Sequence, residues 1–336
     1  MKITQVERFV TAVPHIPSIE KSRPGDYKER PITIIRVHTD EGIVGIGEGG
    51  RGDLMEGVEQ AWVGTDPLSL NLTTMGGAVA MACFDIVGKA LGVPAHKLMG
   101  SKHFDRVPVG WWSPPLEPAE FAAMAEEGAR LGYKTHKLKA RPWNIVETVK
   151  LMTEVAGPDY GIIVDPNFSF GDLATSLRLA RELEPYNIEA FEDPFQYLPG
   201  WHSYHHFRQH SIIPLAPHLG DPKVLMSAIR AEAADMFNMG GHVESLLIMA
   251  GMAEAAGLPV WLQAVGLGLG VSGAYGTHVH AVIRNATIPS DSLHFTREND
   301  LIGGALTPKD GFVDVPDTPG LGVELDMAAV EKYRVG

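Results

Sequence analysis

The sequence predicts an α/β protein in which a (β/α) barrel is accompanied by a smaller domain. Four short apolar runs each end in a polar residue; in chain order these are Lys139, Asp165, Glu192 and His218. The successive intervals are 26, 27 and 26 residues, which suits one strand, one helix and their loops. Because a barrel builds its active site at the carboxyl ends of its strands, these side chains are expected to face one mouth.

The length and composition fit this prediction. A chain of 336 residues exceeds one ordinary domain and accommodates a barrel of usual size plus a smaller domain. With 45% hydrophobic and 21% charged residues, it reads as a soluble globular protein. The net charge of −13 argues against nucleic acid or an anionic membrane as a partner. An anionic small substrate remains compatible, because a bound divalent cation would invert the local field.

The single cysteine and the N-terminus bear on the cellular compartment. Cys83 has no partner for an internal disulfide, which fits a reducing cytoplasm, and its apolar neighbours indicate an ordinary core site. The N-terminus lacks the long apolar run of a signal peptide, and no stretch approaches a membrane span. A cytoplasmic location is therefore expected.

The first third of the chain predicts an antiparallel meander and a helix. Residues 2–13 and 31–47 read as strands, with a turn at residues 40–42. Residues 14–30 form a polar loop of the length typical of lids, and residues 48–53 a second flexible segment. A helix follows over residues 77–91.

The barrel is expected to begin with a strand at residues 107–112. Further strands are expected at residues 235–239 and 257–263. The helices are expected at residues 118–131, 145–156, 173–183, 222–233, 243–256 and 274–283. The C-terminal segment is expected to return and pack on the meander. We therefore divide the chain into residues 1–105, a capping domain, 106–307, the barrel, and 308–336, the returning segment.

Four short motifs in a characteristic order carry a family resemblance: Lys137-x-Lys139, Asp165-x-Asn167, Glu192-Asp193-Pro194 and Met239-Gly240-Gly241. With residues 82–94, they resemble the enolase superfamily, in its mandelate racemase / muconate lactonising enzyme branch, over almost the whole chain. The resemblance implies a modified TIM barrel, (β/α)7β, with an N-terminal α+β capping domain completed by the C-terminal segment. It also implies a homo-oligomer.

The chemistry implied by the resemblance is removal of a proton next to a carboxylate, with Mg²⁺ holding the resulting enediolate. Enolase-superfamily sites are known to use a Lys or His base together with Mg²⁺. A carbon acid beside an ionised carboxylate is very weak, so positive charge has to be in place before the dianion develops. On this resemblance Lys139 is the base, Lys137 its helper, and Asp165 and Glu192 are metal ligands. Asn167 either contacts the substrate or forms a turn.

The third metal ligand departs from the family pattern. The family has Glu or Asp after the fifth strand, whereas the matching interval falls on His218. A neutral imidazole binds divalent ions but softens the site, so weaker Mg²⁺ binding, a preference for another divalent ion and the absence of a functional metal are the alternatives. Asp221 is the other candidate, although it also suits a helix cap before Pro222. We favour His218 as the ligand.

The opposite face of the site departs as well. Asp235 falls where the family's dyad aspartate lies, but Gln263 occupies the histidine position and Asn238 the position of a second lysine. We assign Asp235 to catalysis, and Asn238, Gln263, Asn167 and Asp291 to substrate binding. Weaker alternatives for an acid or base are His242, Asp291 and His294, and a histidine cluster at residues 202–206 is more typical of a solvated helix face.

Three functions follow from this pattern. The first is a lyase that removes the proton α to a carboxylate and eliminates water from a hydroxy or sugar acid, because one good base suffices. The second is a racemase, epimerase or cycloisomerase with an unrecognised second acid or base. The third is a barrel that has lost catalysis and binds a ligand. The substrate is a small carboxylate whose identity would depend on the loops at residues 14–30 and 48–53.

Overall fold

The computed structural model describes residues 1–22, 31–50, 58–197, 200–263 and 269–335. Much of the two loops expected to set specificity, residues 23–30 and 51–53, lies outside the described residues. No helix in the described ranges is both long and apolar enough to cross a bilayer.

The N-terminal part is an antiparallel three-stranded sheet with a helix packed on it, as the sequence predicts. Its strands are β1 (Ile3–Thr11), β2 (Ile32–Thr39) and β3 (Val44–Gly49), in the order β1-β2-β3. Its helical elements are α1 (Pro17–Ser22), η1 (Val58–Trp62), η2 (Pro67–Ser69), η3 (Leu72–Thr74), α2 (Gly77–Leu91) and η4 (Ala95–Leu98). Glycine lets α2 approach β3 closely, since a Cβ on Gly47 would lie 1.9 Å from the Ala78 carbonyl oxygen. Cys83 is fully buried there, at the expected core site.

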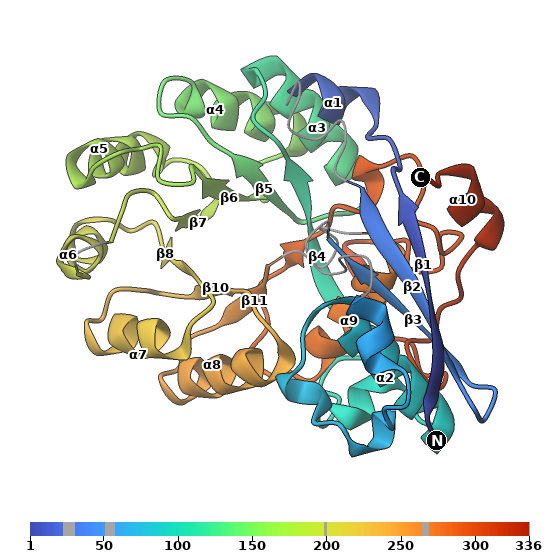
Figure 1. The fold of residues 1–336 in the computed structure, drawn as a ribbon. Coiled ribbons are helices and arrows are strands. Elements are labelled where there is room, and N and C mark those ends of the chain that lie inside the picture. The colour runs from blue at the N-terminus through green and yellow to red at the C-terminus, as the bar shows by residue number, and fades with distance from the viewer. Residues whose placement is uncertain (23–30, 51–57, 198–199, 264–268, 336) are drawn as a thin grey trace.

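The barrel follows. Its strands are β4 (Arg106–Ser113), β5 (Thr135–Lys139), β6 (Gly161–Asp165), β7 (Ile188–Glu192), β8 (Leu215–Ala216), β9 (His218–Leu219), β10 (Phe237–Met239), β11 (Val260–Leu262) and β12 (Ser290–Asp291). Its helices are α3 (Pro118–Arg130), α4 (Ile145–Ala156), α5 (Leu173–Leu183), α6 (His202–His210), α7 (Pro222–Arg230), α8 (Val243–Ala255) and α9 (Gly270–Ala281). Helices α4 to α8 surround the strands in Figure 1.

Parallel pairing carries the strands around the barrel. The order β12-β4-β5-β6-β7-β8 forms one path and β9-β10-β11 the other, with Pro217 separating β8 from β9. β12 lies beside β11 as well, because the Leu262 N–H donates to Ser290 Oγ at 3.2 Å. A (β/α)7β arrangement results, in which β12 is the last strand. The sequence did not predict β12, because a two-residue strand has no periodicity to recognise.

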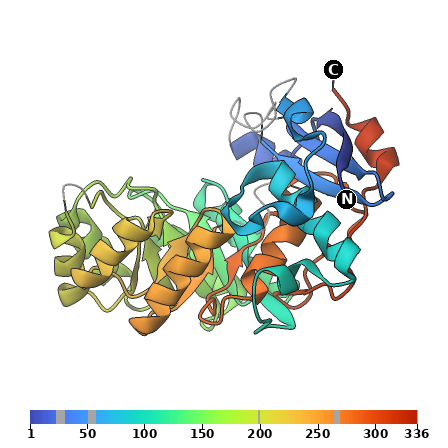
Figure 2. The same ribbon diagram turned by 60° about the horizontal axis from the view of Figure 1, so that its bottom comes forward.

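The C-terminal segment returns to the N-terminal sheet, as expected. The Val335 N–H donates to the Val10 carbonyl oxygen at 2.8 Å, and α10 (Met327–Lys332) lies beside β1 in Figure 1. Figure 2 shows the sheet and α10 together on one side of the barrel. One part differs from the expectation, because β13 (Phe312–Asp314) pairs antiparallel with β4 of the barrel. The division at residues 105 and 307 stays a proposal.

Of the contacts that connect the N-terminal part to the barrel, two bear on the position of the site. Ile19 of α1 packs with Trp112, at the end of β4, and with Leu293, which follows β12. Glu48 of β3 is buried and accepts hydrogen bonds from the backbone and hydroxyl of Ser272, at the start of α9, at 3.0 and 3.2 Å. This anionic cap explains why α9 begins at residue 270 rather than at the expected residue 274. The first contact places the N-terminal segment at the carboxyl end of the barrel.

Candidate active site

Two lysines of β5 point into the barrel at the carboxyl ends of the strands. Side chains alternate along a strand, so Lys137 and Lys139 share one face, while His136 between them points outward to Ser113 and Tyr160. Lys139 pairs in register with Asp165 of β6. The structure therefore brings the two lysines to the same mouth as the polar ends of the neighbouring strands.

Lys137 is surrounded by carboxylates from three other strands. Its Nζ lies 2.9 and 2.8 Å from the two carboxylate oxygens of Glu192, 2.9 Å from Asp291 Oδ2 and 3.3 Å from Asp165 Oδ2. The Lys137 side chain is 3% exposed, so this ammonium neutralises a buried anionic cluster rather than reaching toward a substrate. Asp291, expected as a substrate contact or as a weaker acid or base candidate, is part of this cluster.

Lys139 lies nearer the solvent. Its ammonium pairs with Asp165 Oδ2, and its side chain is 16% exposed, against 3% for Lys137. Asp165 is fully buried, and its Oδ1 accepts the Asn167 N–H at 3.0 Å. Of the two lysines, Lys139 is the one that a substrate in the mouth can reach.

The charges in this cluster are mutually dependent. Burial would lower the pKa of Lys137, but the charges of Asp291, Glu192 and Asp165 raise it well above its ordinary value. Burial would raise the pKa of Asp165, but Lys137 and Lys139 outweigh burial and lower it. Burial and the charge of Asp165 raise the pKa of Glu192, against the opposing effect of Lys137. Lys137 is therefore a fixed cation and is not suited to act as the base.

A group able to bind a metal ion lies beside the lysines. Ligand atoms of Glu192, Asp193 and His218 lie within 4.8 Å of one another; among the described residues this is the group found. The sequence predicted Asp165, Glu192 and His218 as metal ligands. Glu192 and His218 belong to the group found in the structure, whereas Asp165 contacts the two lysines. Burial and the charge of Lys137 lower the pKa of His218, which favours the neutral imidazole that a metal requires. The role of each residue as a ligand stays a prediction.

Sequence reasoning missed Asp193. It directly follows Glu192 and has a positive φ of 46°, and its Oδ1 accepts the His218 N–H at 3.1 Å. Burial raises the pKa of Asp193 to about 7. The sequence signal for Asp193 was an acidic residue immediately after a predicted ligand at a strand end. The turn that directs its side chain into the site is seen only in the structure.

The alternative third ligand, Asp221, has a structural role. Its Oδ1 accepts the backbone N–H groups of Lys223 and Val224 at 2.7 and 3.4 Å, so it caps α7. His242 likewise caps α8, accepting from the Ser245 N–H. The preference for His218 over Asp221 is consistent with this geometry.

The residues present fit a divalent cation. Asn238 Oδ1 and Asp291 Oδ1 are buried acceptors without a hydrogen-bond partner in the described part of the chain. Such acceptors are costly to bury unless a cation or another donor satisfies them. Asn238 lies beside Glu192, and its amide oxygen together with the carboxylate of Glu192 and the imidazole of His218 forms a donor set typical of Mg²⁺ or Mn²⁺.

The amide residues lie near the same group. Asn238 Nδ2 donates to Glu192 Oε1 at 3.0 Å. Gln263 is exposed and follows β11. It lies close to Gly240, because a Cβ added to Gly240 would lie 2.9 Å from Gln263 Oε1 and 3.4 Å from His218 Nε2. Asn167 is exposed after β6, with a φ of 46°. These three amides are positioned at the mouth, and their contact with a substrate stays a prediction.

Asp235 does not join the site, in contrast to its predicted catalytic role. It precedes β10 at the amino end, and its Oδ2 accepts the Leu215 N–H at 2.8 Å. Because Asn238 faces inward, alternation directs Asp235 outward, where its Oδ1 accepts from Arg208 Nε and Nη2 at 2.9 and 2.6 Å. The sequence started the strand two residues too early, so this carboxylate lies before β10, at the amino end of the barrel.

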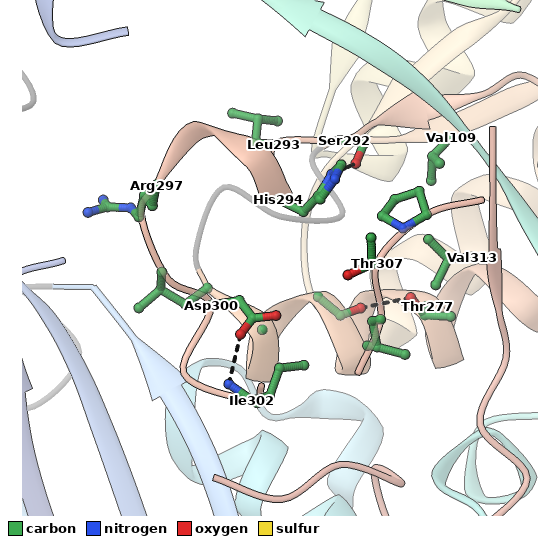
Figure 3. A pocket seen from close by; sticks show the side chains of 15 residues that line it. Val109, Thr277, Ser292, Leu293, His294, Arg297, Asp300, Ile302, Thr307 and Val313 are labelled. Atoms are coloured by element: carbon green, nitrogen blue, oxygen red, sulfur yellow. Dashed lines mark hydrogen bonds between the residues drawn. The ribbon is translucent and has the colours of Figure 1, made fainter. Parts of the chain in front are cut away.

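A separate small cavity lies on the outer side of the barrel wall. It has a volume of about 50 Å³ and is bounded by α9 and the chain after β12 (Figure 3). Its polar groups are already paired: Asp300 accepts the Ile302 N–H, Thr277 donates to the Gly273 carbonyl, and Ser292 contacts His294. Burial lowers the pKa of His294 to about 4. The cavity has room for one or two water molecules, so it is too small for a hydroxy or sugar acid.

The strand that carries the lysines depends on a neutral histidine behind it. Burial lowers the pKa of His136 to about 3, and its Nε2 lies 2.6 Å from Ser113 Oγ. Its folded pKa is below the unfolded value of about 6.5, so its contribution to stability is present above that pH and is lost as the pH falls.

We expect His136→Gln to reduce the pH dependence of unfolding. Between pH 7.5 and 5.0, the free energy of unfolding of the wild type should fall by about 2 kcal/mol relative to the variant. Urea unfolding at both pH values measures this difference. Val149→Ala, a buried non-titrating change, is the control, and an equal pH dependence of wild type and His136→Gln would contradict the expectation.

Comparison with known proteins identifies the family. The family model described as Enolase C-terminal domain-like matches residues 120–329, more than half of the chain. An N-succinylamino acid racemase of Thermus thermophilus is 32% identical over 265 residues, covering 76% of this chain and 70% of the relative. The chain belongs to the enolase superfamily, in its mandelate racemase / muconate lactonising enzyme branch.

The relatives include enzymes of more than one type. An N-succinyl-L-Arg/Lys racemase of Bacillus cereus is 28% identical over 375 residues, covering 100% of this chain and 98% of the relative. A D-xylonate dehydratase of Haloferax volcanii is 28% identical over 369 residues, covering 91% and 86%. The solved structure of the Bacillus cereus racemase matches with a TM-score of 0.82 at 25% identity, covering 100% of this chain and 99% of the other. Racemases and acid-sugar dehydratases are thus both among the relatives.

Proposed function

We propose that this chain removes the proton α to the carboxylate of a small hydroxy or sugar acid and eliminates water from it. The observation that carries the proposal is a partly exposed lysine, Lys139, that pairs with Asp165 at the edge of a buried cluster in which the Lys137 ammonium contacts three carboxylates. A base within reach of the mouth and fixed charge beneath it are the two requirements of this reaction. A cytoplasmic location and self-association are part of the proposal.

The chain's own residues would divide the reaction between them. After its ammonium has released a proton to solvent, Lys139 takes the α-proton as the Cα–H bond breaks, and the electron pair passes into the carboxylate as an enediolate. When the electrons return, the bond from Cβ to the hydroxyl breaks, and the Lys139 ammonium gives its proton to the departing hydroxide, which leaves as water. Lys137 holds Glu192 and Asp291 in place and keeps the cluster neutralised.

A divalent cation, Mg²⁺ by family resemblance, would supply the positive charge that the enediolate needs. Glu192 and His218 are residues that would hold it. Because one ligand is an imidazole, Mn²⁺ or another transition-metal ion is an alternative to Mg²⁺.

Elimination needs one base, and this is the reason for preferring it to racemisation. Asn238 and Gln263 are amides and cannot act as general bases, and Asp235 lies at the far end of the barrel. Residues 264–268, which follow Gln263, are Ala-Val-Gly-Leu-Gly and carry no ionisable side chain. The strands that provide the second base in racemases of this branch offer none here.

A racemase or epimerase is the second candidate. The relatives named as N-succinyl amino acid racemases, at 28% and 32% identity, favour it. Such a reaction would use Lys139 on one face of the α-carbon and a base from another part of the chain on the other.

One experiment separates the candidates. The purified chain is incubated in D₂O with a panel of hydroxy acids, sugar acids and N-succinyl amino acids, with Mg²⁺, with Mn²⁺ or with EDTA. Proton NMR measures exchange at the α-carbon, and a carbonyl reagent measures keto-acid formation. We expect exchange and a keto acid from at least one hydroxy acid. Inversion without a keto acid would assign the racemase, and an absence of exchange throughout would favour a ligand-binding barrel.

A further inference from the structure

We propose that helix α6 carries a separate metal site, formed by His206 and His210, for a late first-row transition-metal ion such as Zn²⁺, Ni²⁺ or Cu²⁺. α6 (His202–His210) is one of the helices that surround the barrel strands in Figure 1. None of its residues belongs to the candidate active site. The inference therefore goes beyond the proposed function and does not depend on it.

The first step is the face of α6 on which the histidines lie. The helix buries Tyr204 and Phe207, whereas His202, His206 and His210 are exposed. Residues four apart in a helix lie on one face, in consecutive turns. Two histidines at this spacing form the metal-binding pair of known helical zinc motifs. The sequence favoured a solvated face for this cluster, and the structure adds His210 to it.

The second step is the distance between two of the imidazole rings. The ring centroids of His206 and His210 lie 4.1 Å apart, with an angle of 22° between the ring planes. Zn²⁺ lies about 2.0–2.1 Å from each imidazole nitrogen, so two nitrogens that share one ion are about 3–4 Å apart. Side-chain rotations would direct both Nε2 atoms toward one ion. His202 makes no ring contact within the described residues, so the geometry favours the His206–His210 pair over the His202–His206 pair.

The third step is the tautomer of His210. Its Nδ1 lies 2.9 Å from the His206 carbonyl oxygen. A carbonyl oxygen only accepts, so Nδ1 carries the hydrogen and Nε2 carries the lone pair that a metal needs. Histidine ligands in metal sites typically donate their other N–H to a carbonyl oxygen or a carboxylate in this way, which fixes the ring. The ring of His210 is therefore already prepared as an Nε2 ligand.

The other polar side chains of α6 are engaged elsewhere. The Nε2 of His205 lies 2.9 Å from the side-chain amide nitrogen of Gln209, which donates to it. Arg208 is the one lysine or arginine of the helix, and it donates to Asp235 Oδ1 at 2.9 and 2.6 Å. The arginine that could repel a bound cation is thus paired with a carboxylate, and His205 provides a matched control on the same helix.

The ligand type sets the ion preference. Two imidazoles suit Ni²⁺, Cu²⁺ and Zn²⁺, whereas Mg²⁺ binds through oxygen ligands. We expect Cu²⁺ to bind most tightly, Ni²⁺ and Zn²⁺ less tightly, and Mn²⁺ weakly. The candidate active site differs in this respect, because its group includes the carboxylates of Glu192 and Asp193.

Ni²⁺ binding to the full-length chain without substrate tests the site. All chains carry His218→Gln, and about 10 mM Mg²⁺ is present to occupy the remaining oxygen ligands of the active site. Isothermal titration calorimetry then compares this chain with four that each carry one more change: His206→Gln, His210→Gln, His202→Gln or His205→Gln. We expect the first two changes to weaken binding at least about 10-fold, because a single imidazole loses the chelate. The last two should change Kd by less than about 3-fold.

A measurement on the wild type does not depend on any variant. In crystals soaked with Zn²⁺, an anomalous peak should lie within about 2.5 Å of Nε2 of both His206 and His210. Circular dichroism and the unfolding midpoint show that each variant used for calorimetry is folded.

Three results would overturn the assignment. Unchanged Ni²⁺ binding in His206→Gln and His210→Gln, or no saturable binding before these changes are made, would reject the site. Loss of binding in His202→Gln with normal binding in His210→Gln would show that the ion is held by the other pair. A Zn²⁺ peak at α6 that contacts only one of the two rings would reject the chelate. Because none of these measurements uses a substrate, their failure and the failure of the proposed function are distinguishable.

Discussion

Lys139→Ala should lose α-proton exchange while the chain stays folded. General-base catalysis contributes about 100-fold to 10,000-fold to a rate, and in this site the proton has no other acceptor of comparable position. Lys137 is 3% exposed and surrounded by Asp165, Glu192 and Asp291, so it cannot substitute. Proton NMR in D₂O measures the rate of α-proton exchange of the variant and the wild type, with the substrate identified in the panel of acids described above.

The fold should tolerate this change because Lys139 is partly exposed and contacts a single carboxylate, Asp165, which keeps its contact with Lys137. The unfolding midpoint of the variant measures this. Lys150→Ala on α4, with a side chain 60% exposed, is the control for removal of a lysine outside the site. Restoration of exchange by an added primary amine would support the role of the missing amino group, and an exchange rate equal to that of the wild type would show that Lys139 is not the base.

The repeated intervals allowed the sequence to predict the central part of the site. Helix α4 begins and ends at the residues expected, and so does α5, because each has an apolar face of helical period between polar strand ends. Lys139 and Asp165 therefore lie at adjacent strand ends in the structure as well. Where the interval between polar strand ends was regular, it correctly predicted the order of the strands and the direction of their last side chains.

The remaining parts depend on interactions that the sequence does not display. β12 has two residues, and Asp291 is recognisable as a member of the cluster only through its contact with Lys137. Asp193 faces His218 because of a turn with positive φ, which is uncommon for residues other than glycine. Asp235 was misplaced because the sequence does not show where this short strand begins; the pairing of Asn238 with His218 fixes the register and leaves Asp235 before β10.

Lys137→Met should destabilise the chain strongly even without substrate or metal. The change leaves Glu192, Asp291 and Asp165 buried together without the ammonium that contacts all three at 2.8–3.3 Å. Removing one partner of a buried ion pair costs about 3–5 kcal/mol, because the remaining charge is uncompensated. Urea unfolding at pH 7.5 measures the free energy of unfolding of variant and wild type.

A second substitution distinguishes loss of charge compensation from loss of packing. In Lys137→Met/Asp291→Asn one of the stranded carboxylates is replaced by an amide of similar size, so the double variant should be more stable than Lys137→Met alone. Asp291→Asn by itself should destabilise the wild type, because Lys137 then loses a carboxylate at 2.9 Å, and the opposite signs of the two effects define a coupling energy. If Asp291→Asn has the same effect in both backgrounds, the two side chains are independent. The buried ammonium would then act as a space-filling group, and the fixed positive charge assigned to it beneath the base would have no energetic support.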